Sequence, residues 1–491
     1  MSSREETPLI FERGGPGRST PYLPPPAAGE KPIETILPPS ALRDRPPALP
    51  EVAEPEIVRH YTTLSHRTVS VDGTFYPLGS CTMKYNPKVN ERLAALPGFA
   101  RLHPLQPPET VQGILELLWT LERMLAEIAG LDAVTLQPAA GAQGELTGLL
   151  LIRAYHEDRG QADRREVLVP DSAHGTNPAS CTLAGYRAVA VRTDPRGGID
   201  LEDLKARLSD RTAAMMITNP STLGLFEEQI GTLADLVHAA GGLMYMDGAN
   251  MNALVGIARP GDFGIDAMHF NLHKTFATPH GGGGPGAGPV ACRKLLEPYL
   301  PVPRIVREGN AFRFETAFPR SIGPVKCFWG NVGVLIRAYA YLRAHGAEGL
   351  RRNTEHAVLN ANYLLARLRR TFRVPYDRPC MHEFVLDGSP FLRRHGVRTL
   401  DLAKRLLDFG FHPPTIYFPL IVHEALMIEP TETENKETLD RFVEAMLRIA
   451  EEARTDPETL KKAPHTTPVR RLDEVRAAKN PILRWRKPPE D

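Results

Sequence analysis

The chain has 491 residues and a formal net charge of +1, with 59 Lys and Arg residues against 58 Asp and Glu residues. This balance argues against a general binder of nucleic acids or acidic membranes, which needs a basic surplus. Apolar residues make up 42 % and charged residues 24 %, as in ordinary globular proteins. Since domains usually contain roughly 100–200 residues, the length predicts more than one.

The five cysteines are scattered and form no C-x-x-C pair (Cys81, Cys181, Cys292, Cys327 and Cys380). This pattern argues against a disulfide framework or a zinc site and indicates a reducing compartment. The first residues contain no apolar stretch long enough for a signal peptide, and no run of about 18 apolar residues occurs. We therefore expect a cytoplasmic protein without a membrane span.

Residues 1–55 carry 13 of the 46 prolines of the chain. Proline removes backbone donors and does not sustain helices or sheets, so the segment is predicted to be an extended arm. The apolar stretches Leu9–Phe11 and Ile33–Leu37 favour an arm that lies on a partner surface. A disordered linker is the alternative.

Residues 56–330 are predicted to form a large α/β domain. Apolar residues at helical spacing between Ile114 and Ile128 indicate a helix that ends at Gly130. Short apolar runs then alternate with helical stretches, which predicts a mostly parallel sheet covered on both faces. The runs are VTLQP (134–138), EVLVPD (166–171), RAVAVRTD (187–194), AAMMITNP (213–220) and LMYMDGA (243–249). Ligands bind such sheets at the carboxyl ends of the strands.

Residues 331–463 are predicted to form a smaller α+β domain, followed by a basic tail at 464–491. A helical pair covers 331–346 and 348–370, and further helices are expected at 399–410 and 436–453. The runs EFVLDG (383–388) and ALMIEPT (425–431) are the expected strands.

Lys274 lies in an apolar segment rich in histidine and glycine, from Asp266 to Val290. Glycines follow at 281–284, 286 and 288, and glycine lets the backbone approach a flat ligand closely. A lysine nucleophile must lose its proton part of the time, which a desolvated pocket favours. We expect Lys274 to hold pyridoxal 5'-phosphate as a Schiff base. An ordinary surface lysine is the alternative.

His269 and His273 are four residues apart, which raises the question of a metal site. Such a pair binds metal when both residues share a helix and a third ligand is present. Only Phe, Asn and Leu lie between them, so we expect no metal here.

Asp247 stands where an apolar strand gives way to small residues. A carboxylate at the carboxyl end of a strand can pair with the protonated ring nitrogen of pyridoxal phosphate and keep the ring an electron sink. An aspartate that caps a turn is the alternative. The position of Lys274 on the next predicted strand-and-loop unit favours the cofactor role.

Three further segments supply candidate cofactor contacts. Gly141, Ala142 and Gln143 lie where a strand leads into a helix, and their N–H groups would bind an anion. The segment lacks both the GxxxxGK[ST] and the GxGxxG pattern, so it is no nucleotide loop. His174 could stack on the cofactor ring, although a loop histidine without function is common. Thr222 and Asn250 could bind the phenolic oxygen or the phosphate, or could be ordinary polar loop residues.

Together these segments resemble fold-type-I pyridoxal-phosphate enzymes, and more closely the glycine decarboxylase of the glycine cleavage system, the P-protein family. The resemblance extends from about residue 35 to the end of the chain. It rests on YPLGSCTMKYNP (76–87), QPAAGAQGE (137–145), DSAHGTNPAS (171–180), NPSTLGLFEE (219–228), DGANMNA (247–253), NLHKTFATPHGGGGPG (271–286) and the tail segment that begins HTTPVRRLDE at His465.

The resemblance implies that Lys274 forms the Schiff base, Asp247 pairs with the ring nitrogen and His174 stacks on the ring. Gly141 to Gln143 would belong to the phosphate cradle. His273, Asn250 and Thr222 would be supporting contacts, and the loop at 79–84 would cover the site.

The family occurs as one long chain or as two subunits, and this chain resembles the lysine-bearing subunit 2. The implied partners are subunit 1, with two copies of each subunit, and lipoylated H-protein. The implied reaction is decarboxylation of glycine with transfer of the aminomethyl group to the lipoyl arm.

Two alternatives remain open at this point. Another fold-type-I enzyme, an amino-acid decarboxylase or a cysteine desulfurase, would not need lipoylated H-protein, and Cys81 is the one loop cysteine that suits a desulfurase. A scaffold subunit that keeps the fold without chemistry would give no covalent label on Lys274 after borohydride reduction.

Overall fold

The computed structural model describes residues 7–18, 29, 31–45, 47, 49–281 and 286–486. The chain divides into two compact units, residues 1–73 with 466–491 and residues 74–465. Of the glycines that follow Lys274, Gly282 to Gly284 lie outside the described residues. The predicted domain boundary between residues 330 and 331 falls inside the second unit and stays a prediction.

The first unit contains the proline-rich arm and the C-terminal tail. Its described helices are η1 (Ile10–Glu12), η2 (Ile33–Thr35), η3 (Pro39–Ala41), α1 (Glu54–His66) and α15 (Glu474–Lys479). Before α1, the described residues form only short 3-10 helices, because their prolines lack the N–H donor that a longer helix requires. Phe11 of the arm stacks on Trp485 of the tail, with ring centroids 5.0 Å apart.

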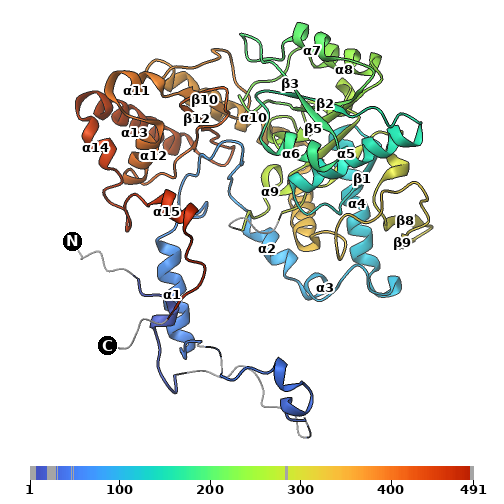
Figure 1. The fold of residues 1–491 in the computed structure, drawn as a ribbon, viewed down its shortest axis with the longest axis horizontal. Helices are drawn as coiled ribbons and strands as arrows, with labels where there is room; N and C mark the ends of the chain where they lie inside the picture. Colours follow the sequence, from blue (N-terminus) through green and yellow to red (C-terminus); the bar gives the residue numbers. More distant parts are fainter. Residues whose placement is uncertain are drawn as a thin grey trace. The chain divides into compact units, whose positions relative to one another are not determined.

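The second unit is built on a seven-stranded sheet with the order β1-β7-β6-β5-β4-β2-β3 (Figure 1). Strands β2 to β6 pair in parallel, whereas β7 runs antiparallel to both β6 and β1. The bounds are β1 (Ala133–Thr135), β2 (Glu166–Pro170), β3 (Arg187–Val191), β4 (Thr212–Thr218), β5 (Leu243–Gly248), β6 (Ala267–Phe270) and β7 (Val290–Cys292). The mostly parallel sheet confirms the predicted α/β class.

Alternating residues of the strands enter two different cores, as the two-residue period of a strand requires. Met244 and Met246 of β5 belong to a core shared with α4, α8 and α10. Tyr245, between them, belongs to a core shared with α5 and α6 on the other face. The strands are therefore apolar on both faces, which explains why they are continuous apolar runs in the sequence.

The helices of this region connect the strands and cover the sheet. They are α2 (Lys88–Ala94), α3 (Pro97–Ala100), η4 (Pro108–Thr110), α4 (Gln112–Ala129), α5 (Gly141–Asp158), α6 (Thr176–Leu183), α7 (Leu201–Arg207), α8 (Ile230–Ala239), η5 (Met251–Ala253), η6 (Pro260–Phe263), α9 (Leu272–Thr275) and η7 (Glu297–Tyr299). A separate antiparallel ribbon consists of β8 (Arg304–Glu308) and β9 (Ala311–Glu315).

The C-terminal part of the second unit begins with α10 (Val332–Leu368), which is interrupted at Gly346, where φ is +60°. This interruption matches the predicted helical pair. A three-stranded antiparallel sheet follows, in the order β10-β12-β11, with its own apolar core. The elements are β10 (Phe384–Asp387), α11 (Ser389–His395), α12 (Thr399–Asp408), β11 (Thr415–Ile416), β12 (Ala425–Ile428), α13 (Lys436–Thr455) and α14 (Pro457–Lys462).

Among the described residues, no helix combines the length and the apolar character that a bilayer span requires.

Candidate active site

The carboxyl ends of the parallel strands open into a cavity of about 240 Å³. Its lining comes from the segments after β1, β2, β4, β5 and β6, which is where ligands bind in sheets of this kind. The lining residues are Ser80, Ala140, Gly141, Ala142, Glu145, His174, Thr176, Thr218, Thr222, Asp247, Ala249, Asn250, Asn271, His273 and Lys274. The cavity thus brings together every site residue predicted from the sequence except Gln143.

Lys274 lies in α9, the single helical turn that follows β6. Its Nζ atom donates a hydrogen bond to the backbone carbonyl of Ser80, at 2.7 Å. The amine is half-buried in the cavity wall, where a small ligand can reach it. Behind the lysine, a side chain on Gly286 would come within 2.9 Å of His273 Nδ1, and one on Gly288 within 2.1 Å of the carbonyl of Ala140. Glycine is needed at these two positions because the backbone passes so close.

Asp247 is the penultimate residue of β5 and is 3 % exposed. Its carboxylate accepts hydrogen bonds from Asn177 Nδ2 (3.1 Å) and from the backbone N–H of Ala249 (2.9 Å). His269 Nε2 lies 3.3 Å from Asp247 Oδ1, and Tyr245 OH lies 2.8 Å from the other ring nitrogen of His269. The parallel register of β5 and β6 sets Asp247 directly opposite His269.

These contacts keep Asp247 ionised although it is buried. Burial raises the pKa of Asp247, but the electrostatic effect of the adjacent His269, the hydrogen bond from Asn177, the charge of Lys274 and the N–H of Ala249 outweigh it, and the net pKa is lowered. Burial lowers the pKa of His269 itself. A buried carboxylate that stays charged at the carboxyl end of a strand is suited to bind a cationic ring.

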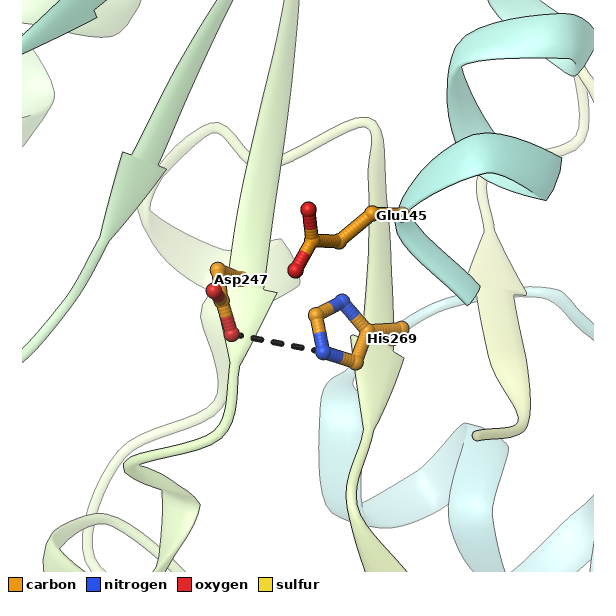
Figure 2. A group of neighbouring side chains, drawn as sticks. All are labelled: Glu145, Asp247 and His269. Carbon is orange, nitrogen blue, oxygen red and sulfur yellow. Dashed lines mark ion pairs between the residues drawn. The ribbon is translucent and has the colours of Figure 1, made fainter. Parts of the chain in front are cut away.

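Glu145, on α5, points toward the same pair (Figure 2). Burial, followed by the negative charge of Asp247, raises the pKa of Glu145 to about 7. Its oxygens accept hydrogen bonds from Thr176 Oγ1 (2.7 Å) and Ser180 Oγ (2.8 Å), which hold α6 against α5. Glu145 was not predicted from the sequence, because only the fold brings it beside Asp247.

The N-terminus of α5 forms one wall of the cavity. The first intrahelical bond joins the N–H of Gly144 to the carbonyl of Ala140, so the N–H groups of residues 141–143 have no acceptor within the helix. An 18-residue helix that points its N-terminus at a cavity is suited to bind a phosphate. The side chain of Gln143 binds the backbone of Ala139 and Val325, which leaves its backbone N–H as the one candidate contact for an anion.

The remaining predicted residues line the cavity in different ways. His174 precedes α6, is held by Thr176 (Nδ1 to Oγ1, 2.9 Å) and has its ring exposed toward the cavity side of the sheet. The hydroxyl of Thr222 donates to the carbonyl of Ser172, and the amide of Asn250 donates to the carbonyl of Pro220 at 2.8 Å. Both donors are therefore used by the protein itself.

His269 and His273, considered above as a metal pair, occupy strand β6 and helix α9 respectively and do not share a helix. His269 instead orients Asp247, a role that their spacing in the sequence did not indicate. Burial, followed by the proximity of His280 and Lys274, lowers the pKa of His273 to about 3, so its ring is neutral at physiological pH.

A larger depression, of about 860 Å³, lies between α4 and α10. Its lining contains neither lysine nor histidine, and its acidic residues Glu127 and Asp262 pair with Arg259. The candidate catalytic groups predicted from the sequence thus gather in the smaller cavity.

Comparison with known proteins agrees with this geometry. The family model described as "Glycine cleavage system P-protein" matches residues 30–318, and the model of the glycine dehydrogenase C-terminal domain matches residues 353–467. A protein of Caldanaerobacter subterraneus subsp. tengcongensis named "Probable glycine dehydrogenase (decarboxylating) subunit 2" is 58 % identical over 485 residues, which cover 99 % of this chain and 100 % of the relative. A protein of the same name from Halalkalibacterium halodurans is 59 % identical over 98 % of each chain.

Solved structures show the same fold. An inhibitor-bound glycine decarboxylase (P-protein) superposes with a TM-score of 0.71, at 23 % identity, over 85 % of this chain and 94 % of that one. A NifS-like protein superposes with a TM-score of 0.59, at 14 % identity, over 77 % of this chain and 99 % of the other. The fold-type-I architecture predicted from the sequence is confirmed, and the chain belongs to the glycine cleavage system P-protein family, among relatives named as subunit 2.

Proposed function

We propose that this chain carries the cofactor of a glycine decarboxylase, in which pyridoxal 5'-phosphate supports decarboxylation of glycine and transfer of the aminomethyl group to the lipoyl arm of H-protein. One observation carries the proposal. Lys274, Asp247 and the N-terminus of α5 face one cavity, in a chain that is 58 % identical over its whole length to a relative named as a glycine dehydrogenase subunit.

The residues present fit this cofactor. They offer an amine for its aldehyde, a buried ionised carboxylate for its ring nitrogen and a helix N-terminus for its phosphate. Buried polar atoms without a partner among the described residues also lie at the cavity wall: Thr218 Oγ1, Asn271 Oδ1 and His273 Nδ1. When bound, the cofactor supplies a cationic ring that accepts the electrons left by carbon dioxide.

Each residue then has a defined task. Lys274 would hold the cofactor covalently through Nζ, and the amino group of glycine would replace that nitrogen and free the lysine amine. Asp247, which stays ionised, would keep a proton on the ring nitrogen. His269 and Tyr245 fix the orientation of Asp247. His174 would contact the cofactor ring.

The chain is proposed to work with subunit 1, two copies of each, and with lipoylated H-protein in the cytoplasm. The word "subunit" in the names of its relatives supports a partner chain. A cavity at the ends of the strands suits a substrate carried on a flexible arm, because a lipoyl group must reach the aminomethyl group from outside.

A desulfurase is less well supported by Cys81, the loop cysteine near the site. Burial raises the pKa of the Cys81 thiol, and the charge of Lys274 offsets this only in part. A thiol that keeps its proton is a poor nucleophile.

The decisive experiment measures release of labelled carbon dioxide from glycine by this chain reconstituted with subunit 1. We expect release only when lipoylated H-protein is present, and we expect the Lys274→Ala variant to release none and to carry no pyridoxyl adduct after borohydride reduction. Lys294→Ala, at a surface lysine paired with Glu297, is the control and should behave as wild type. Release without H-protein would indicate a different decarboxylase.

A further inference from the structure

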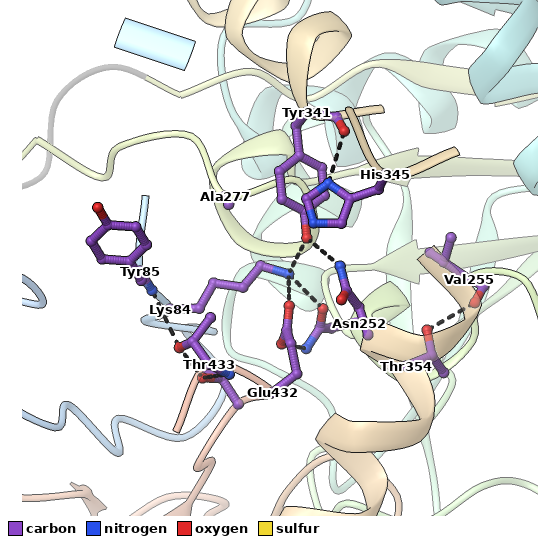
Figure 3. A network of polar contacts seen from close by, with 12 residues as sticks. Lys84, Tyr85, Asn252, Val255, Ala277, Tyr341, His345, Thr354, Glu432 and Thr433 are labelled. Atoms are coloured by element: carbon purple, nitrogen blue, oxygen red, sulfur yellow. Dashed lines mark hydrogen bonds and ion pairs between the residues drawn. The ribbon is translucent and has the colours of Figure 1, made fainter. Parts of the chain in front are cut away.

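The loop before the large sheet, Gly79–Lys84, is fixed at every second residue by a carboxylate from the C-terminal part of the same unit. The N–H of Ser80 donates to Glu383 Oε2 at 2.6 Å, and the N–H of Thr82 donates to Glu429 Oε2 at 2.9 Å. Lys84 Nζ lies 2.7 Å from Glu432 Oε1. Figure 3 shows this last ion pair, with the ammonium also facing Asn252 and Tyr341.

The backbone of this loop needs such anchors. Ser80 and Thr82 both have positive φ, 66° and 45°, a region that side chains other than glycine enter only at a cost of roughly 1–3 kcal/mol when the surroundings enforce it. The loop is also attached to β12 by a bridge between Leu78 and Ile428. This conformation turns the carbonyl of Ser80 toward Lys274, where it accepts the Nζ hydrogen bond.

The two carboxylates come together because of the register of the small sheet. Phe384 of β10 pairs with Ile428 of β12, so Glu383 and Glu429 are the next residues at the same end of the antiparallel pair. Both are completely buried, as is His382 beside them. His382 Nε2 lies 3.9 Å from Glu383 Oε1 and from Glu429 Oε1.

Two buried carboxylates this close do not both ionise. Burial, followed by the charge of Glu429, raises the pKa of Glu383 well above its ordinary value, and burial raises that of Glu429 to about 7. Burial lowers the pKa of His382 to about 3, so it adds no positive charge. The other titratable groups that face the pair are Lys274, Cys81, Cys380 and Glu432. Burial thus favours the neutral form of Glu383, which can still accept the N–H of Ser80.

We propose that Glu383 is a positioning residue for Lys274: it fixes the backbone of Ser80, whose carbonyl holds the lysine amine in the cavity, and Glu429 supports the same turn at Thr82. The inference rests on the role proposed above for Lys274. Glu383 does not line the cavity itself, and it contacts two residues that do: Ser80, through the N–H above, and Asn250, whose Nδ2 donates to Glu383 Oε1 at 3.4 Å.

The same three side chains, His382, Glu383 and Glu429, lie close enough to offer one ligand atom each to a metal ion. Three protein ligands suffice for a metal site that completes its coordination with water, so the competing interpretation has to be tested. The second oxygen of each carboxylate is already engaged by the loop N–H groups. Loop positioning accounts for both of these hydrogen bonds, and a metal site accounts for neither.

The test uses the cofactor-free full chain and two measurements: hydrogen exchange of the peptide that contains Ser80 and Thr82, and the rate of acetylation of Lys274 by acetic anhydride. Lys294, whose side chain is 81 % exposed, is the internal standard for acetylation. Glu424→Ala is the matched control, because Glu424 is also buried and accepts a backbone N–H, from Thr399 at 2.7 Å. Glu424 directly precedes β12, whereas Glu429 directly follows that strand.

We expect Glu383→Ala to increase hydrogen exchange at residues 80–82 by about 10–100-fold, because one strong hydrogen bond is lost. We also expect it to change the acetylation rate of Lys274 severalfold. Glu383→Gln, the neutral isostere that keeps an acceptor oxygen, should restore both to within about threefold of wild type. Glu424→Ala should change neither. Equal effects of Glu383→Ala and Glu424→Ala at Lys274, or a stoichiometric metal lost on Glu429→Ala, would overturn the proposal. Neither measurement depends on glycine turnover, so they remain informative if the proposed activity fails.

Discussion

Asp247 and Asp266 are both buried aspartates next to a histidine. They lie at opposite ends of the neighbouring strands β5 and β6. Asp266 precedes β6, where it accepts a hydrogen bond from the N–H of Met244 and binds His238 Nε2 at 2.6 Å. Asp247 ends β5 and faces the cavity. Position on the strand, and not burial, separates an aspartate that stabilises the fold from one placed for chemistry.

Asp247→Asn should therefore reduce kcat for glycine decarboxylation by about 100-fold or more, because a neutral amide does not hold a proton on the ring nitrogen. Asp266→Asn should lower the midpoint of thermal unfolding and leave kcat within about twofold. The two variants are compared in steady-state assays of the reconstituted complex and in thermal melts. Equal losses of kcat in both would contradict the role of Asp247.

Glu145 gives a prediction about pH. Its raised pKa, about 7 against an ordinary 4.5, means that the folded state binds this proton more tightly than the unfolded state. The free energy of unfolding should therefore fall as pH rises from about 4.5 to about 7, by at most about 3 kcal/mol from this group. Glu145→Gln removes this titrating group, so the stability of the variant relative to wild type should increase as pH rises over the same range. Urea unfolding of the cofactor-free chain at several pH values measures this, and a relative decrease would refute it.

The sequence indicated residues whose chemistry stands out locally, and it missed those that act through the fold. Lys274 and Asp247 were found because a lysine in a glycine-rich segment and an aspartate after an apolar strand are unusual by themselves. From the sequence, His269 is considered only as a metal ligand with His273, because its partners Tyr245 and Asp247 lie on another strand and no local pattern shows them. Glu383 precedes an ordinary apolar strand, and its link to Ser80 spans 303 residues. No local pattern reports such a contact.

At the scale of elements, α5 approaches the sheet closely through its glycines. A Cβ atom on Gly148 would lie 2.1 Å from Tyr245 Cε2, and one on Gly144 would lie 2.7 Å from His269 Cβ. The residues that a larger side chain would displace are those that orient Asp247. The two glycines thus allow α5 to lie close to the sheet. This position of the helix also brings its N-terminus to the cavity.

Gly148→Ala should destabilise the protein by about 1–3 kcal/mol, because a rigid buried ring would have to move, and should lower cofactor affinity as well. Gly113→Ala is the matched control in the equally long helix α4, where a Cβ atom meets nothing within 4 Å. That change should stabilise by up to roughly 1 kcal/mol, because alanine favours helix. Chemical denaturation gives both values, and a stabilised Gly148→Ala variant would contradict the close packing.

The buried parallel strands were predictable because each is a short apolar run between helices. The strands β7 to β9 were not predicted, and β6 was predicted only as the unbounded strand of the strand-and-loop unit that carries Lys274. Strand β6 contains His269 between apolar residues, and β8 and β9 form a partly exposed ribbon rich in charged residues. The pairing of these strands depends on partner strands that the rest of the chain brings near. In addition, three to five residues are too few for a periodic pattern that would distinguish a strand.

At the scale of the whole molecule, the first unit exposes apolar side chains in its arm and its tail. In the tail, Ile482 is 84 % and Leu483 is 87 % exposed, and in the arm Ile36 is 61 % exposed. Monomeric proteins seldom expose neighbouring large apolar side chains, and such patches commonly mark interfaces. This supports the expectation that the arm lies on a partner subunit, and we extend that expectation to the tail.

The double variant Ile482→Asp, Leu483→Asp should accordingly weaken association with subunit 1 by about tenfold or more, because truncating central apolar anchors typically costs at least 1–2 kcal/mol of binding. The fold of residues 74–465 should be unaffected, since Ile482 and Leu483 belong to the other unit and their side chains are almost fully exposed. Leu359→Asp, at an exposed leucine on α10, is the control for adding charge. Light scattering of the mixed subunits should give a mass for two copies of each with wild type and with the control, and separate subunits with the double variant. An intact assembly of the double variant would place the interface elsewhere on the chain.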